Sequence, residues 1–204
     1  MSIERYRDRT RINHWIVVLL FLSAGLTGFS LFHPALFFLS SLFGGGTWSR
    51  ILHPFFGLVT VIGFFFLFMQ VWRDNVWNKG DSEWMRKSPL LLRGDEDAMP
   101  PVGKYNGAQK AIFWLFATCL VLLLVTGFTF WRPWFADAFP IPVRRLAVLI
   151  HSASAFILIL GLIIHVYAAI WVKGSVQAMT QGRVSESWAR RHHALWAKEV
   201  SGEK

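Results

Sequence analysis

The sequence predicts an all-α fold, an integral membrane four-helix bundle that residues 1–204 form as a single domain. Two observations lead to this prediction. The chain is 54% hydrophobic with a mean hydropathy of +0.41, and yet its formal net charge is +9. These values are compatible because charged and apolar residues are segregated along the chain. Four stretches contain no charged residue, and each is long enough for a helix of about 20 residues to cross the hydrocarbon region.

Each uncharged stretch predicts one membrane-spanning helix. We expect spans at about residues 13–32, 52–72, 109–131 and 145–172. The first stretch continues beyond residue 32, where Pro34 and three consecutive glycines predict an apolar loop at the membrane interface. The apolar run after Trp15 is long and lacks a small-residue cleavage site, so we do not expect a signal peptide. Cys119 is the single cysteine, which excludes an intramolecular disulfide and a C-x-x-C-H haem attachment.

The 21 Lys and Arg residues divide unevenly between the two sides of the predicted bundle. All of those in the N-terminal arm, the segment between the second and third spans, and the C-terminal tail fall on one side. The other side has only Arg50, Arg132, Arg144 and Arg145. The positive-inside rule therefore predicts that both termini are cytoplasmic, with an amphipathic cytoplasmic segment after Lys173. Topology and membrane lipid account for the positive charge, and we expect no nucleic acid as a partner.

Four of the seven histidines fall within the predicted spans: His14, His53, His151 and His165. A histidine that faces hydrocarbon is costly, so each of these predicts a functional site. The predicted topology places His14 and His165 near the cytoplasmic face and the other two near the opposite face. The remaining histidines, His33, His192 and His193, lie outside the spans, where we expect loop, surface or partner-contact roles.

The spacing of the intramembrane histidines predicts two haem sites. His151 and His165 are 14 residues apart. In an α-helix this spacing is within roughly 40° of a whole number of turns, so both side chains project from one face, and it corresponds to a rise of roughly 21 Å. Two histidine pairs at two depths suit two haem groups, each with two axial imidazoles. Gly57 and Gly161, four residues from a histidine, would leave room for a porphyrin, although close helix packing alone is the better explanation of small residues in a membrane helix. An interhelical hydrogen bond is the alternative for any one histidine.

Several motifs recur in one order and carry a family resemblance. They are R-I-N-H-W (residues 11–15), R-I-L-H-P-F-F-G (50–57), V-G-K-Y-N (102–106), V-T-G (125–127), W-R-P (131–133), H-V-Y-A-A-I-W-V-K-G-S (165–175) and W-A-R-R-H-H (188–193). Together they resemble the gamma (cytochrome b) subunit of membrane-bound respiratory formate dehydrogenase, over nearly the whole chain.

The resemblance implies a function, cofactors and partners. It implies a multi-pass protein of the bacterial inner (cytoplasmic) membrane that anchors the iron–sulfur beta subunit and the catalytic alpha subunit. Electrons would pass from the iron–sulfur partner across the membrane to a quinone, menaquinone or ubiquinone. Two haem b groups would be held by His14 with His165 and by His53 with His151. The quinone pocket would comprise the side chains beside the inner haem, namely Asn106, Gly107, Ala108, Gln109 and His165.

Other functions remain open at this point. The cytochrome b subunit of a membrane-bound nickel–iron hydrogenase, or of a related periplasmic oxidoreductase, would share the same electron transfer with a different donor. A transporter that uses histidines as proton relays would favour Asp or Glu within the spans and inverted repeats, and the sequence shows neither. Asn106 is predicted to donate a hydrogen bond to a quinone carbonyl, or alternatively to cap the third span.

Overall fold

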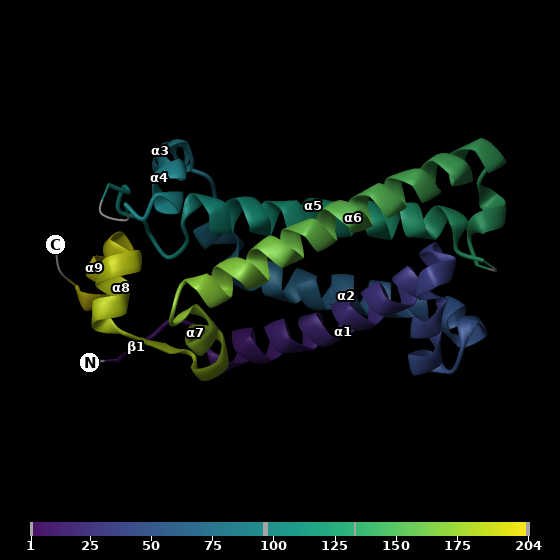
Figure 1. Ribbon diagram of the computed structural model, residues 1–204, viewed down its shortest axis with the longest axis horizontal. Coiled ribbons are helices and arrows are strands. Elements are labelled where there is room, and N and C mark those ends of the chain that lie inside the picture. The colour runs from purple at the N-terminus through teal and green to yellow at the C-terminus, as the bar shows by residue number, and fades with distance from the viewer. Residues whose placement is uncertain (1, 96–97, 133, 203–204) are drawn as a thin grey trace. The chain divides into compact units, whose positions relative to one another are not determined.

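The computed structural model describes residues 2–95, 98–132 and 134–202, so Pro133 of the W-R-P motif lies outside the described residues. Four helices in it are long and apolar enough to cross a membrane (Figure 1). They are α1 (Asp8–Phe32), α2 (Gly46–Val71), α5 (Gly107–Phe130) and α6 (Ile141–Trp171). These helices confirm the predicted fold class, a four-helix membrane protein.

The helices begin before the predicted spans, and they end at the predicted residue or one residue before it. α2 begins at Gly46 rather than near residue 52, because a helix continues until a residue breaks it and not until the hydrocarbon region ends. The predicted interface loop contains a 3-10 helix, η1 (Pro34–Phe43). The Nδ1 atom of His33 accepts a hydrogen bond from the backbone N–H of Ala35 (3.2 Å) and so caps η1. Gly44, with φ of +83°, ends it.

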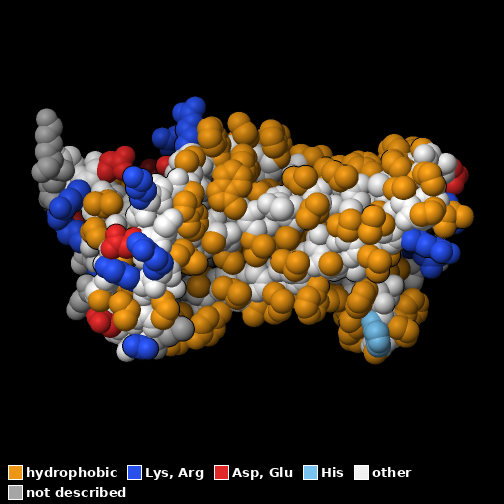
Figure 2. All heavy atoms as spheres, turned by 90° about the horizontal axis from the view of Figure 1, so that it is seen from above, with side chains coloured by type: hydrophobic (Ala, Val, Ile, Leu, Met, Phe, Trp, Pro, Cys, Tyr) orange, Lys and Arg blue, Asp and Glu red, His pale blue; other side chains and the backbone are white. Residues whose placement is uncertain are grey.

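The long helices expose apolar side chains over most of their surface. Between 6% and 22% of each spanning window is buried inside the protein. Figure 2 shows a broad surface of hydrophobic side chains, with the Lys, Arg, Asp and Glu side chains mostly outside it. A surface of this kind is stable against lipid tails, and the helices satisfy their backbone hydrogen bonds internally. The protein is therefore a multi-pass membrane protein in contact with lipid.

Shorter elements connect the long helices. They are β1 (Ser2–Glu4), η2 (Trp72–Asn75), α3 (Lys79–Lys87), α4 (Pro89–Leu92), η3 (Ala136–Ala138), α7 (Ser175–Gln181), β2 (Arg183–Ser185), α8 (Glu186–His192) and α9 (Ala194–Ser201). β1 and β2 pair antiparallel, with Ile3 opposite Val184, which the all-α prediction did not include. The tail after Lys173 forms three short helices and a strand, because Gly182, with φ of +80°, ends α7.

Residue contacts divide the chain into two compact units. Unit 1 comprises Met1–Arg11, Gln70–Phe116 and Leu160–Lys204, and unit 2 comprises Ile12–Met69 and Ala117–Ile159. Each of the four long helices contributes residues to both units. That the chain forms a single domain stays a prediction.

Arg5 is the central side chain of unit 1. It is 5% exposed, and its Nη2 atom donates a hydrogen bond to the backbone carbonyl of Lys104 (2.7 Å). The guanidinium carbon lies 5.0 Å from the ring centroid of Trp196 and 5.1 Å from that of Trp188, within the range of cation–π attraction. Because these partners come from the middle segment and the tail, Arg5 ties the N-terminal arm to both.

His193 completes this cluster, and the predicted surface role for it is wrong. The side chain is 3% exposed, because it packs between Arg5 and the middle segment. Its Nδ1 atom donates to the carbonyl of Gly103 (2.8 Å), so its Nε2 atom accepts from Arg5 Nη2 (3.0 Å). Burial, followed by the positive charge of Arg5, lowers the pKa of His193 from 6.5 to about 3. The imidazole is therefore neutral at physiological pH.

The shifted pKa of His193 predicts that unit 1 loses stability in acid. Below pH 6.5 the imidazole of His193 becomes protonated in the unfolded state but stays neutral in the folded state. The free energy of unfolding therefore falls as the pH decreases from 6.5 to about 3. The slope from this group approaches about 1.4 kcal/mol per pH unit. Limited proteolysis of the tail should accelerate over that range. His193→Gln should make proteolysis of the tail faster at every pH but less dependent on pH. A pH dependence that is unchanged in this variant would show that other groups cause it.

Candidate haem site

His53 on α2 and His151 on α6 face each other in unit 2. Their ring centroids are 6.3 Å apart and their planes are inclined by 69°. A metal–imidazole nitrogen bond is about 2.0 Å long and that nitrogen lies about 1.1 Å from the ring centroid, so two imidazoles on opposite sides of one iron have centroids about 6.2 Å apart. The observed separation is close to this distance. The structure thus brings together the two histidines that the sequence predicts for one haem.

Thr27 on α1 determines which nitrogen of His53 carries the proton. The Oγ1 atom of Thr27 lies 3.1 Å from His53 Nδ1 and also donates to the carbonyl of Ser23 (2.7 Å). A hydroxyl has one hydrogen, so Oγ1 accepts the hydrogen bond from Nδ1–H. The carbonyl of Ala24, 3.0 Å from Nδ1, is a second acceptor. The lone pair of His53 is therefore on Nε2, the nitrogen that a metal would bind.

Thr126 on α5 has the same role toward His151. Its Oγ1 atom donates to the carbonyl of Leu122 (2.6 Å) and lies 3.0 Å from His151 Nδ1. By the same argument Nδ1 carries the proton and Nε2 has the lone pair. Hydrogen bonds of this kind at the second nitrogen fix the tautomer and the ring orientation of metal-binding histidines. Both imidazoles are thus held in the form that ligates a haem iron.

A glycine follows each threonine and admits the imidazole ring. A Cβ atom on Gly28 would lie 3.0 Å from His53 Cε1, and one on Gly127 would lie 3.5 Å from His151 Cε1. Sequence reasoning did not single out either threonine or Gly28 as part of the site. A signal was present, because Thr-Gly-Phe occurs twice, at residues 27–29 and 126–128, once in the helix that precedes each ligand helix.

Three further observations test whether haem b fits these residues. Two imidazoles with free Nε2 atoms are the donor set that a bis-histidine haem requires. The hydroxyl of Ser49, four residues before His53, is fully buried and has no hydrogen-bond partner among the described residues. A Cβ atom on Gly57 would meet nothing within 4 Å, so space is open beside α2. In contrast, a Cβ atom on Gly161 would lie 2.8 Å from Leu115, so that glycine serves close helix packing.

The second predicted pair, His14 and His165, belongs to two different units. His14 is in unit 2, where its ring meets the ring of Trp15 edge-on (centroids 5.3 Å apart). His165 is in unit 1, where its ring meets that of Phe116 (5.8 Å). The pairing of these two histidines at an inner haem stays a prediction.

The segment predicted as the quinone pocket begins α5. Asn106 Oδ1 accepts from the backbone N–H of Gln109 (2.9 Å), and Gln109 Oε1 accepts from that of Asn106 (3.0 Å). This reciprocal pair is a capping box, so the capping alternative for Asn106 is confirmed. A Cβ atom on Gly107 would lie 2.8 Å from the carbonyl oxygen of Asp81, which shows that α3 packs closely here. Ala108 is partly buried beside them, and contact of this segment with quinone stays a prediction.

Membrane cytochromes of the b type typically consist of lipid-facing helices that hold pairs of histidines. In this chain the paired imidazoles are held through hydrogen bonds at Nδ1. Comparison with known proteins identifies the family. The model of the prokaryotic cytochrome b561 family matches residues 5–182. The chain therefore belongs to the prokaryotic cytochrome b561 family and is a haem b electron-transfer protein of the membrane.

Individual relatives are similar to this chain over nearly its full length. The nitrate-inducible formate dehydrogenase cytochrome b556(Fdn) subunit of Escherichia coli is 43% identical over 198 residues, 97% of this chain and 91% of the relative. The formate dehydrogenase cytochrome b556(fdo) subunit of the same organism is 41% identical, over 98% and 93%. The formate dehydrogenase cytochrome b556 subunit of Haemophilus influenzae is 40% identical, over 97% and 83%. The resemblance given by the motifs is thereby confirmed.

Replacing Thr126 with Val should weaken haem binding without unfolding the helix. The change removes the acceptor for His151 Nδ1–H, and loss of such a bond typically lowers metal affinity about 10- to 100-fold. Thr129→Val is the matched control, because Thr129 Oγ1 donates to the backbone carbonyl of Thr126 (2.7 Å) and to no histidine of the described residues. Haem titration of the extracted apoprotein measures both variants. Equal affinities would contradict a role of Thr126 in holding the ligand.

The two glycines should differ in their tolerance of alanine. Gly28→Ala would push a methyl group against His53 Cε1, at 3.0 Å, whereas Gly127→Ala leaves an ordinary contact of 3.5 Å with His151. Overpacking of this kind costs about 1–3 kcal/mol, so the first variant should bind the haem at His53 about 5- to 150-fold more weakly and contain less of it when purified. The second should keep it. Identical haem contents would show that the ring of His53 can move aside freely.

Proposed function

We propose that this chain is the di-haem cytochrome b subunit of a respiratory formate dehydrogenase in the bacterial inner membrane. In this role it anchors an iron–sulfur beta subunit and a catalytic alpha subunit, and it conducts electrons from the iron–sulfur partner across the membrane to menaquinone or ubiquinone. The proposal rests on the pair His53 and His151. Their ring centroids are 6.3 Å apart, and each Nδ1 atom forms a hydrogen bond with a threonine hydroxyl. The three relatives described above are all formate dehydrogenase subunits, which supports the choice of complex.

In this function the side chains hold the haems at fixed positions and determine their surroundings. His53 and His151 are assigned to the outer haem, and His14 and His165 to the inner one, so α6 contributes one ligand to each. When bound, haem b supplies a one-electron carrier at each pair. Thr27 and Thr126 keep the outer imidazoles oriented and basic, and the apolar helices keep water from the site.

Quinone binding is assigned to the start of α5 beside the inner haem. Asn106, Gly107, Ala108 and Gln109 lie in unit 1, as does His165. The capping box holds the Asn106 side chain by its oxygen, which leaves the amide N–H atoms of that side chain to donate to a quinone carbonyl. Lys110, the next residue, forms a buried ion pair with Asp81 (2.8 Å), which fixes this end of α5 against α3.

The haem content of the purified protein tests the proposal directly. A reduced-minus-oxidised absorption spectrum with b-type bands and about two haems per chain is the expected result. His151→Ala should remove one haem and leave the other, because His14 and His165 are untouched. One haem in the wild-type protein, or none, would overturn the di-haem assignment.

Co-expression with candidate partner subunits distinguishes the donor. Reduction of the haems by formate, and not by hydrogen, is expected in membranes that also contain the alpha and beta subunits of a formate dehydrogenase. Reduction by hydrogen in the presence of nickel–iron hydrogenase subunits would instead assign the chain to the alternative complex.

Asn106→Asp separates quinone binding from helix capping. Aspartate caps a helix about as well as asparagine, so α5 should keep its stability. The substitution removes the amide donor, and quinol formation should fall about tenfold while haem content stays at two. Asn106→Ala, which also removes the cap, provides the comparison. Normal quinol formation in the Asp variant would restrict Asn106 to its structural role.

A further inference from the structure

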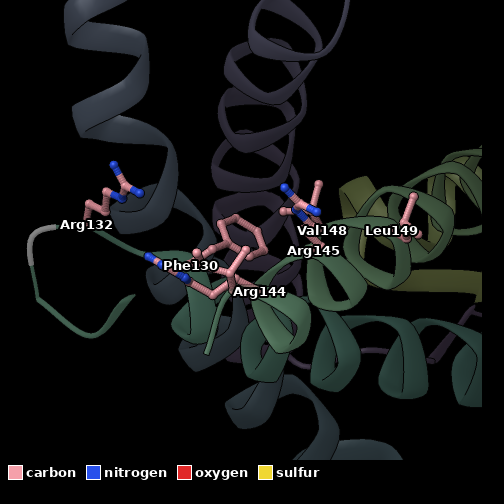
Figure 3. Close-up of a pocket in the computed structure, with 7 residues that line it drawn as sticks. Phe130, Arg132, Arg144, Arg145, Val148 and Leu149 are labelled. Carbon is pink, nitrogen blue, oxygen red and sulfur yellow. The ribbon is translucent and has the colours of Figure 1, made fainter. Parts of the chain in front are cut away.

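A positively charged pocket opens at the N-terminal end of α6, in unit 2. Its volume is about 560 Å³, and it is lined by Arg132, Arg144 and Arg145 together with apolar side chains that include Phe130 and Val148 (Figure 3). The predicted topology places this end on the non-cytoplasmic side, where arginine is otherwise scarce. Three arginines around one pocket at this position therefore point to a bound anion.

The pocket adjoins the candidate haem ligand. Phe130, one of its lining residues, packs edge-on against the ring of His151, with centroids 5.2 Å apart and planes inclined by 81°. Phe130 thus forms a wall shared by the pocket and the haem site. An anion bound in the pocket would lie close to whatever His151 holds.

The register of α6 directs Arg144 to the same side as His151. Arg144 precedes the histidine by seven residues. This spacing is within about 20° of two full helical turns, and it separates the two residues by about 10.5 Å along the helix axis. Arg144 forms an ion pair with Asp137 at 3.9 Å, and this pair is weak because the Asp137 side chain is 95% exposed. The Arg144 guanidinium can therefore exchange that partner for a better one.

A second polar group occupies a similar position on α2. Ser49 precedes His53 by four residues, within about 40° of one full turn, so the two residues share a helix face. Ser49 is fully buried, and its Oγ atom has no hydrogen-bond partner among the described residues. A buried hydroxyl without a partner is costly and indicates a missing acceptor. Each ligand helix thus carries a donor on the N-terminal side of its histidine.

We infer that the Arg144 pocket binds the propionate carboxylates of the haem held by His53 and His151, with Ser49 as a second donor. The inference rests on the proposed function, since it requires a haem on that pair. A guanidinium and a carboxylate form short, charge-assisted hydrogen bonds, stronger than neutral ones. Haem b is held without covalent links to the chain, so these bonds would add directly to its retention.

Haem exchange with natural and esterified haem tests the inference. The extracted wild-type protein is reconstituted with haem b or with its dimethyl ester, which has no carboxylate, and the rate of haem transfer to an excess of apomyoglobin is measured. For haem b, Arg144→Gln should raise the rate of loss from this site about tenfold, the effect of one charged hydrogen bond. For the ester, the same substitution should change nothing. Arg144→Lys should restore part of the retention, and Ser49→Ala should act in the same direction as Arg144→Gln.

Arg50→Gln is the matched control, because it removes an arginine from the same predicted side without touching the pocket lining. It should leave both rates unchanged. An effect of Arg144→Gln that is equal for the two haems, or equal to that of Arg50→Gln, would overturn the inference. Release of an anionic phospholipid from Arg144→Gln with unchanged haem loss would assign the pocket to lipid instead. A wild-type spectrum without two b-type haems would refute the proposed function before this comparison begins.

Discussion

A threonine hydroxyl has a single hydrogen, and both Thr27 and Thr126 donate it to a carbonyl of their own helix. Each oxygen is then available only as an acceptor toward the Nδ1–H group of a histidine on a neighbouring helix. The metal-binding nitrogen of each ring follows from this one constraint. The proposed haem rests on these tautomers together with the 6.3 Å separation of the two ring centroids.

The membrane explains why such bonds matter here. Helices surrounded by lipid have no water to satisfy a polar side chain, so each buried hydroxyl or imidazole needs a protein or cofactor partner. The threonine–histidine pairs of unit 2 meet this requirement from within the chain. Ser49 does not, and the arginines around Arg144 bring positive charge to one end of the same unit. The same requirement thus connects the haem ligands, the orphaned hydroxyl and the inferred propionate pocket.

Sequence reasoning predicted the fold class and the histidine pair at His53 and His151, because hydropathy and helix periodicity depend only on residue order. It did not identify Thr27 or Thr126, although Thr-Gly-Phe occurs at both, since a threonine in an apolar helix usually bonds its own backbone. It missed the contact of Arg5 with His193 for a similar reason, as residues from the two ends of the chain meet only in the folded protein. The starts of the long helices were placed too late, because uncharged length does not mark where a helix begins, whereas their ends were predicted to within one residue.

Electron paramagnetic resonance of the oxidised protein tests the central claim most directly. A ferric haem whose two axial imidazoles are inclined by 69°, the angle between the rings of His53 and His151, should give a highly anisotropic low-spin signal. Substitution of either histidine should abolish that signal and leave the signal of the second haem. A high-spin ferric signal in the wild-type protein, or the same highly anisotropic signal in both variants, would contradict ligation by this pair.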